Sequence, residues 1–351
     1  MLGFNALKYS SYYTCNLNNA EFFFANGTIA TSWLEGNIIN EMTANSACTS
    51  SSSHNSLVDS ANVLYWVLDP SKYFLPANTG TQTYNTIYLG WAGNVISPSN
   101  TLLSNTLTGE APQLSCAQPW NTIIGCGSGT SSYGYYDNGN MVFNANGLGL
   151  YQNFIGTNTP SGWTKTDPSG QFTQDNGVIL NAKGATVPSA NLITISTNYG
   201  LNPNQILDTL ASSSAVNGGD DASGPGYMGI NDLGGGYGFK SVSWQLSGLS
   251  QIAGSAYTTG PTISAVYKPP NVNTKTNDVL TIYWPSTSTA SFYDNYNALD
   301  TGTITSSIPT TNLAIGIEWS SGNAVGHVQW IRSRAYPPNG AMPTVTYGIV
   351  G

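Results

Sequence analysis

The sequence predicts an all-β fold of two packed antiparallel β-sandwich or jelly-roll units. Three observations favour this class: short runs rich in Val, Ile, Thr, Tyr and Trp recur along the 351 residues, Gly, Asn, Ser and Pro separate these runs, and helical periodicity is almost absent. Many short strands spaced by turn signals are typical of sandwiches and jelly rolls. The chain is long enough for two such units or more.

The apolar runs place the expected strands along the chain. In the first third we expect strands at residues 21–24, 29–35, 62–68 and 83–91. Later strands are expected at residues 177–181, 192–197, 238–246, 262–267, 278–284, 291–296, 313–319 and 326–333. One stretch, residues 203–213, favours a helix, because Ile206, Leu207 and Leu210 would share one helical face.

Charged residues are scarce in this chain. Asp, Glu, Lys and Arg make up 7% of it, against roughly a quarter in an ordinary domain. Amides and hydroxyls do not titrate, so such a surface keeps its solvation when the pH changes. We therefore expect an extracellular protein, and an acidic environment would suit it. The formal net charge of −8 disfavours nucleic acid and anionic membranes, which need a basic patch.

The apolar content decides between folding and disorder. At 40% hydrophobic and 11% aromatic residues, the chain is far richer in rings than disordered chains are. The sequence has no apolar run of membrane-spanning length. The opening residues lack the pattern of a signal peptide, so we expect any export leader to lie outside this sequence.

Four cysteines suggest two disulfides and an oxidising compartment. Cys116 and Cys126 have a spacing that can close a local loop, and Cys15 and Cys48 are the remaining pair. Four unpaired thiols in a cytosolic chain are the alternative. A metal site is the least favoured reading, because no CxxC motif or Cys/His cluster occurs.

One N-glycosylation sequon occurs, at Asn26-Gly27-Thr28. A single match is the kind of event that chance produces in a chain rich in Asn and Thr.

The closing segment, VQWIRSRAYPPNGAMPTVTYG at residues 328–348, resembles the end of large cell-surface proteins of archaea, many of them acidophiles. Further matching motifs lie at residues 21–23, 25–28, 32–36, 63–66, 108–115, 136–139 and 156–163. In that family an uncharacterised β domain precedes a concanavalin-like jelly roll. The resemblance implies an N-terminal β-sandwich domain at 1–115, a cysteine-bounded loop and linker at 116–140, and a concanavalin-like jelly roll at 141–351.

Two departures from the family pattern accompany this resemblance. The insertion between Cys116 and Cys126 stands where a short connection is expected, and the chain begins one strand later than usual. A sandwich that lacks its opening strand exposes unpaired backbone, which a strand from another subunit could cover. This suggests strand exchange in a filament or surface layer, and a chain boundary of no structural meaning is the plainer reading.

Catalytic residues are hard to find in this sequence. Retaining glycoside hydrolysis needs two carboxylates about 5 Å apart, and no strand carries a Glu-x-Asp or Glu-x-x-x-Glu pattern. Glu35 and Glu41 are separated by a turn, and Glu318 stands alone in its strand. His54 and His327 have no acid and nucleophile beside them in sequence. We expect no catalytic residue, with a glycoside hydrolase as the alternative.

Loops rich in oxygen ligands are the better candidates for binding a metal ion. Asp220 and Asp221 lie in a tight Gly-rich loop, and Asp232 could add a third carboxylate of the hard-oxygen type that Ca²⁺ prefers. A plain turn is the favoured reading, so we expect no cofactor, with calcium as the alternative.

Aromatic residues in strands suggest carbohydrate binding, because sugar rings stack on Trp and Tyr. The candidates in or beside expected strands are Tyr237, Trp244, Trp284, Tyr293 and Trp319. In the closing strand, Arg332 and Arg334 alternate in phase with Trp330, and we expect them to face water or a neighbouring molecule as an interface. Ile331 is then the residue that faces the core.

Two functions remain open. The first is a non-enzymatic structural or adhesive component of an extracellular cell surface, whose partners are copies of itself or other surface proteins. The second is a carbohydrate-binding or carbohydrate-cleaving jelly roll, which rests on fold analogy.

Overall fold

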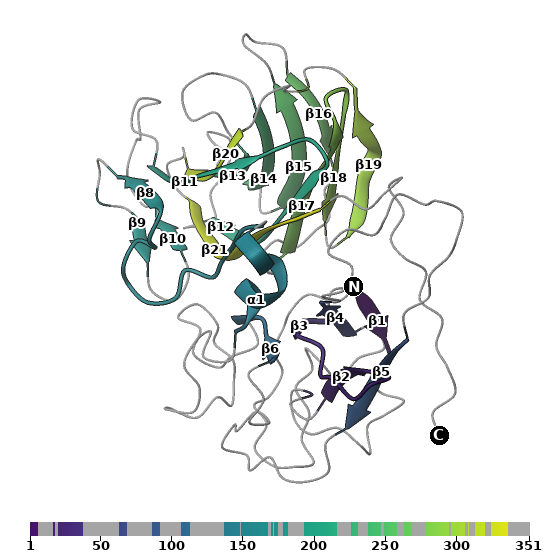
Figure 1. The fold of residues 1–351 in the computed structure, drawn as a ribbon. Helices are drawn as coiled ribbons and strands as arrows, with labels where there is room; N and C mark the ends of the chain where they lie inside the picture. The colour runs from purple at the N-terminus through teal and green to yellow at the C-terminus, as the bar shows by residue number, and fades with distance from the viewer. Residues whose placement is uncertain are drawn as a thin grey trace.

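The computed structural model describes most of the predicted strands (Figure 1). The residues that it describes are 1–5, 17, 20–37, 63–68, 86–91, 107–112, 137–147, 149–167, 170, 172–174, 178–181, 193–215, 226–230, 238–246, 249–257, 263–267, 278–294, 296–305, 308, 313–319 and 324–335.

The described residues of the N-terminal unit form two small sheets. A four-stranded sheet has the order β1 (Leu2–Phe4), β4 (Val63–Val67), β3 (Ser32–Asn37) and β6 (Thr108–Glu110). Its β3–β6 pair is parallel and the other pairs are antiparallel. Beside it, β2 (Ala20–Phe24) pairs with β5 (Ile87–Trp91).

The second unit is a sandwich of two larger antiparallel sheets. Within the described residues, the eight-stranded sheet consists of β19 (Asn297–Ile304), β18 (Thr289–Asp294), β17 (Asp278–Ser286), β12 (Gln205–Ala215), β21 (Ala324–Ala335), β10 (Val178–Asn181) and β9 (Phe172–Gln174), with β7 (Tyr151–Gln152) paired to β21. The seven-stranded sheet consists of β16 (Ile263–Tyr267), β15 (Leu249–Tyr257), β14 (Gly238–Leu246), β13 (Gly226–Ile230), β20 (Leu313–Trp319), β11 (Ile193–Leu201) and β8 (Trp163–Thr166). Strands β12, β17 and β18 pack across the sandwich on β13, β14 and β15.

The predicted fold class is confirmed: the residues that the structure describes are all-β with almost no helix, and they form two packed units in which only the β3–β6 pair is parallel. One short helix, α1 (Gly139–Phe143), lies where the two units meet and is followed by a 3₁₀ turn, Ala145–Gly147 (Figure 1). No helix in the described ranges is long and apolar enough to cross a membrane. Each predicted strand overlaps an observed one, and the domain limits at residues 115 and 140 remain a prediction.

The predicted helix at residues 203–213 is wrong, because this stretch forms β12. Ile206 and Leu210 point to one face of the sheet and Leu207 to the other, since successive side chains alternate. All three are buried, because the sandwich covers one face and the N-terminal unit covers the other. A strand buried on both faces loses the period of two, and its apolar spacing then imitates a helix.

A buried cluster of side chains from both units joins them. Trp33 on β3 packs edge-on against Trp330 on β21, with ring centroids 5.5 Å apart, and against Phe143 of α1 at 5.1 Å. Leu210 of β12 belongs to the same cluster. The hydrophobic core of the N-terminal unit therefore continues onto the outer face of the eight-stranded sheet.

Candidate functional site

The closing strand β21 positions the polar side chains that lie at the junction of the two units. Trp330 and Arg332 alternate on it, and their antiparallel partners on β12 are Leu210 and Asp208. Residues directly opposite in such a pair share a face of the sheet. One face therefore carries Trp330, Arg332 and Asp208, and the N-terminal unit lies over it.

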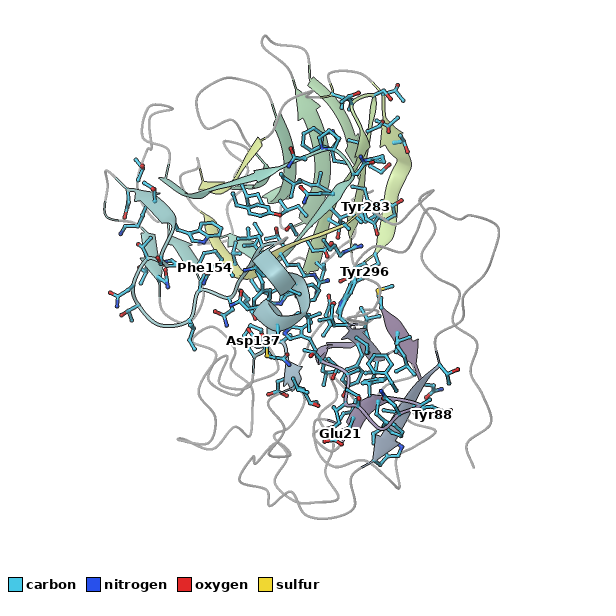
Figure 2. All side chains as sticks on the ribbon, in the orientation of Figure 1. Glu21, Tyr88, Asp137, Phe154, Tyr283 and Tyr296 are labelled. Atoms are coloured by element: carbon cyan, nitrogen blue, oxygen red, sulfur yellow. The ribbon has the colours of Figure 1, made fainter. Side chains whose placement is uncertain are left out.

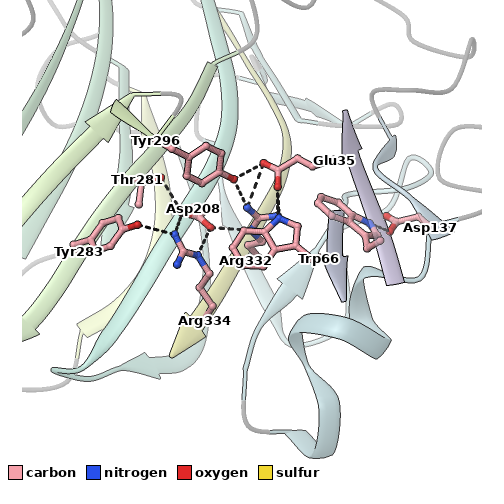
Figure 3. Close-up of polar contacts among 10 residues, drawn as sticks. Glu35, Trp66, Asp137, Asp208, Thr281, Tyr283, Tyr296, Arg332 and Arg334 are labelled. Atoms are coloured by element: carbon pink, nitrogen blue, oxygen red, sulfur yellow. Dashed lines mark hydrogen bonds and ion pairs between the residues drawn. The ribbon is translucent and has the colours of Figure 1, made fainter. Parts of the chain in front are cut away.

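Five side chains form a connected ionic network, which we name the Arg332 cluster: Glu35, Asp208, Tyr296, Arg332 and Arg334 (Figure 3). Arg332 Nε donates to Asp208 Oδ2 at 2.8 Å, and its Nη1 lies 3.0 Å from Glu35 Oε2. Arg334 Nε donates to the same Asp208 oxygen at 2.8 Å. Two positive and two negative charges thus balance inside the protein, with the side chains of Glu35, Asp208 and Arg332 at 0% exposure.

Neutral groups complete the bonding of the two carboxylates. Glu35 accepts hydrogen bonds from the Tyr296 hydroxyl and from Trp66 Nε1. Asp208 Oδ1 accepts a hydrogen bond from the Thr281 hydroxyl at 2.8 Å. Buried carboxylates are tolerated when their remaining lone pairs accept hydrogen bonds. The bonds from Tyr296, Trp66 and Thr281 meet this requirement.

Four aromatic rings surround the Arg332 guanidinium. Its central carbon lies 4.5 Å from the ring centroid of Trp66, 4.6 Å from those of Phe143 and Trp330, and 5.2 Å from that of Trp33. Aromatic faces attract a cation, and more strongly where water is excluded. Trp33 and Trp66 come from the N-terminal unit and Trp330 from the sandwich, so both units contribute to the enclosure.

The network fixes the charge state of Asp208. Burial by itself raises the pKa of this carboxyl, but the guanidinium charges of Arg334 and Arg332 outweigh burial and lower the pKa to about 2. Burial likewise opposes the charged form of Arg332, and Glu35, Tyr296 and Asp208 together raise its pKa above the usual range. Asp208 is therefore ionised at any ordinary pH and is unsuited to donate a proton.

Two further carboxyls lie at the N-terminal unit: Glu110 on β6 is buried, and Asp137, just before α1, is half-buried. Asp137 accepts four hydrogen bonds, from Trp33 Nε1, the Gly139 amide, the Tyr151 hydroxyl and Asn153 Nδ2, at 2.5 to 2.8 Å. Burial nevertheless raises the pKa of Asp137. Glu110 is 9% exposed, and its Oε2 has no hydrogen-bond partner in the described part of the chain. Burial, and then the charge of Asp137, raise the pKa of Glu110 to about 8.

The structure brings Trp330, Arg332 and Arg334 together as the sequence predicts, but the predicted exposure of the arginines is wrong. Arg332 is completely buried and the Arg334 side chain is 9% exposed. The surface that they meet is the chain's own N-terminal unit, because Glu35 of β3 is their counter-ion. Ile331 faces the core of the sandwich as predicted, and Trp330 is equally buried on the opposite face.

The predicted carbohydrate-binding residues have different outcomes. The prediction that Trp284 binds carbohydrate is wrong, because this side chain is completely buried between the sheets. Tyr293 is half-buried and its ring centroid lies 4.4 Å from that of Tyr283. Trp244 and Trp319 lie in β14 and β20, where the backbone alone is described.

The remaining predicted residues are described to different extents. Glu318 and His327 lie in β20 and β21, again with the backbone alone described, and Asn26 is exposed in a turn. The predicted residues outside the described ones are Cys15, Glu41, Cys48, His54, Cys116, Cys126, Asp220, Asp221, Asp232 and Tyr237.

Sequence reasoning missed Glu35, Asp208 and Tyr296 as partners of the arginines. One signal was present: Arg332 alternates with Trp330, and a charge in phase with a tryptophan in a strand indicates a covered face. The chain has only nine Lys and Arg residues, so two of them in one strand is a concentration that calls for counter-ions.

No protein-family model matches the sequence, and no curated protein matches it significantly. Solved structures resemble about half of the chain. They include a Bacillus licheniformis beta-glucanase (15% identity, TM-score 0.38, 53% of this chain and 97% of that chain). They also include the Emp47p carbohydrate recognition domain (9%, 0.41, 53% and 94%) and the Crh5 transglycosylase (12%, 0.38, 54% and 85%).

Replacing Arg332 by Met should lower the free energy of unfolding by about 3 to 5 kcal/mol, because Glu35 is left as a buried charge without a cation. Denaturant titration measures the change. Lys165→Met, at an exposed position on β8, is the control and should shift stability by less than about 0.5 kcal/mol. Equal effects of the two substitutions would contradict the ionic role of Arg332.

Stability should also depend on pH in two opposite ways. Glu110 binds its proton more tightly in the folded protein than in the unfolded chain. Its contribution to the free energy of unfolding is therefore complete below pH 4.5, the ordinary pKa of a glutamate, and is lost as the pH rises to about 8. Asp137, whose pKa is raised too, acts in the same direction. Asp208 binds its proton less tightly when folded, so its contribution is lost as the pH falls below 3.8 through about 2.

The unfolding free energy, measured from pH 2 to 9, should therefore be greatest near pH 4 as far as these groups decide it. Above that pH the decline reaches at most about 1.4 kcal/mol per pH unit for each group. Glu110→Gln, which keeps the shape and removes the charge, should flatten the decline between pH 5 and 8. An unchanged slope in that variant would show that Glu110 titrates normally.

Proposed function

We propose that this chain is a non-enzymatic, extracellular adhesive protein that binds carbohydrate on the outer face of its eight-stranded sheet. The single observation that carries the proposal is the Tyr283–Tyr293 ring pair, which lies on that face beside the Arg332 cluster. Both rings are half-buried, so each still presents part of its surface to a ligand.

Register places hydroxyl groups on the same face. Tyr283 is directly opposite Ser291, and Ser291 is directly opposite Thr303 on the next strand. The exposed hydroxyls of Ser291 and Thr303 are 2.9 Å apart. A sugar offers C–H groups to aromatic rings and hydroxyls to polar side chains, so a surface with both features suits it.

The Arg332 cluster holds one end of this surface rigid. Arg334 Nη2 donates a hydrogen bond to the Tyr283 hydroxyl at 3.2 Å, and the Arg334 guanidinium is tied to Asp208. A ring held in place before binding loses little conformational entropy when a ligand arrives. Figure 2 shows Tyr283 and Tyr296 on the side of the sandwich that turns toward the N-terminal unit.

Binding without cleavage fits the carboxylates of this face better than hydrolysis does. Asp208 and Glu35 are both held in ion pairs, and a retaining glycosidase needs one carboxyl that can give up a proton and one that can attack the sugar. The scarcity of charged residues supports an extracellular location, which is also where the archaeal surface proteins that the sequence resembles are found. Calcium binding by the loop around Asp220 stays a prediction.

Tyr293→Ala should weaken polysaccharide binding about tenfold, which corresponds to about 1.4 kcal/mol of lost ring contact. A glycan array identifies the ligand and calorimetry measures the affinity. Tyr88→Ala is the matched control, because Tyr88 is an exposed tyrosine on β5 that stacks on Phe23. No glycan bound by the wild type, or release of reducing sugar during incubation, would contradict the proposal.

Assembly by strand exchange is the second candidate. Strands β1 (Leu2–Phe4) and β6 (Thr108–Glu110), which end the four-stranded sheet in the described part of the chain, are three residues each. The outer edge of a sheet carries backbone N–H and C=O groups that can pair with a strand from another copy.

Light scattering should then show oligomers that grow with concentration, and electron microscopy should show filaments. Leu2→Asp, which would disturb the packing of β1 on the core, should alter this assembly, whereas Lys165→Ala should not. A monomer at all concentrations would contradict strand exchange.

A further inference from the structure

The sequon at Asn26 lies in a well-defined turn. β2 ends at Phe24, and the chain then reverses and runs back beside β2, where Ile29 bridges to Phe23 and the Ala30 amide donates to the Phe22 carbonyl at 2.7 Å. The Gly27 amide donates to the Phe24 carbonyl at 2.8 Å, and the Phe24 amide donates to the Thr28 carbonyl at 2.9 Å. These bonds close a tight hairpin with Asn26 near its tip.

Gly27 gives this hairpin its shape. Its φ is +81°, in the left-handed region, whereas Ala25 and Asn26 have negative φ. A type I turn followed by a left-handed glycine is a common hairpin loop. Glycine enters that region without strain, so the middle residue of the sequon is also the residue that the turn needs.

The Asn26 side chain is held with its nitrogen available. Asn26 Oδ1 accepts a hydrogen bond from the Thr28 amide at 2.9 Å, which turns the carbonyl end of the side chain into the hairpin. Nδ2, on the other side of the amide carbon, is then directed away from that bond. Residues 25–28 are all exposed, and a Cβ built on Gly27 would meet nothing within 4 Å. The tip therefore has room for a bulky group.

Sequons are rarer in this chain than its composition would produce by chance. The chain contains 38 Asn, 40 Ser and 38 Thr residues. Random placement would produce about eight Asn-x-Ser/Thr motifs, whereas the sequence has one. One sequon is thus fewer than chance gives, and the one that is present occupies an exposed hairpin tip.

We propose that Asn26 carries an N-linked glycan. Asn26 Nδ2 forms a bond to the anomeric carbon of a sugar supplied on a lipid phosphate. The bond from that carbon to the phosphate oxygen breaks, the lipid phosphate leaves with the electron pair, and a base of the cell's glycosyltransferase takes the amide proton.

The test is peptide mass spectrometry of the full chain recovered from the cells that produce it. The peptide that contains Asn26 should carry the mass of a glycan, and Asn26→Gln should remove it. Thr28→Ala should also remove it although Asn26 is kept, whereas Thr28→Ser should retain it, because the sequon accepts either hydroxyl. An unmodified Asn26 in the recovered protein would overturn the proposal.

Failure here is distinguishable from failure of the proposed function. Asn26 lies on the N-terminal unit and Tyr293 on the sandwich, so Asn26→Gln should leave carbohydrate binding at the Tyr283–Tyr293 face unchanged. Loss of that binding in Asn26→Gln would show that the glycan, rather than the ring pair, makes the contact.

Discussion

Arg332 places a positive charge where water does not reach, and that charge must be neutralised by groups the fold itself supplies. The sandwich supplies Asp208 and the N-terminal unit supplies Glu35, with four rings around the guanidinium from both units and the helix between them. Separating the units would leave Glu35 without its cation and Arg332 with half of its counter-charge. Because buried unpaired charge is costly, the network makes each unit depend on the other. The network also fixes one relative orientation of the two units, because ion pairs are directional. Apolar packing between Trp33 and Trp330 alone would restrict that orientation less.

The same constraint explains how a chain with so few charges uses them. Glu35, Glu110, Asp208, Arg332 and Arg334 are buried or nearly so at or near the junction, and Asp137 is half-buried there. Hydroxyls and amides, which do not titrate, far outnumber the remaining charged side chains in the sequence. The pKa of Asp208 is lowered and that of Glu110 is raised. Both shifts make the free energy of unfolding greatest in a mildly acidic range, with losses at lower pH from Asp208 and at higher pH from Glu110.

Much of the strand pattern could be predicted from sequence, because turn residues and β-branched or aromatic runs are local signals. Residues 203–213 could not, since β12 is apolar on both faces and its periodicity is hidden. Arg332 was expected to face solvent because alternation shows that two residues share a face but not whether another unit covers it. For the same reason Trp284 was expected at a binding surface although it packs between the sheets. The pairing of Glu35 with Arg332, nearly the whole chain apart in sequence, depends on tertiary packing that no local pattern records.

The interdependence of the two units is the central claim, and differential scanning calorimetry tests it most directly. The wild-type chain should unfold in one transition whose calorimetric and van't Hoff enthalpies agree, because neither unit tolerates the charges left by loss of the other. In a variant carrying both Glu35→Gln and Arg332→Met, which removes the inter-unit ion pair, the transition should broaden or divide in two. Two separate transitions in the wild type would contradict the account, since each unit would then be stable without the charges of its neighbour.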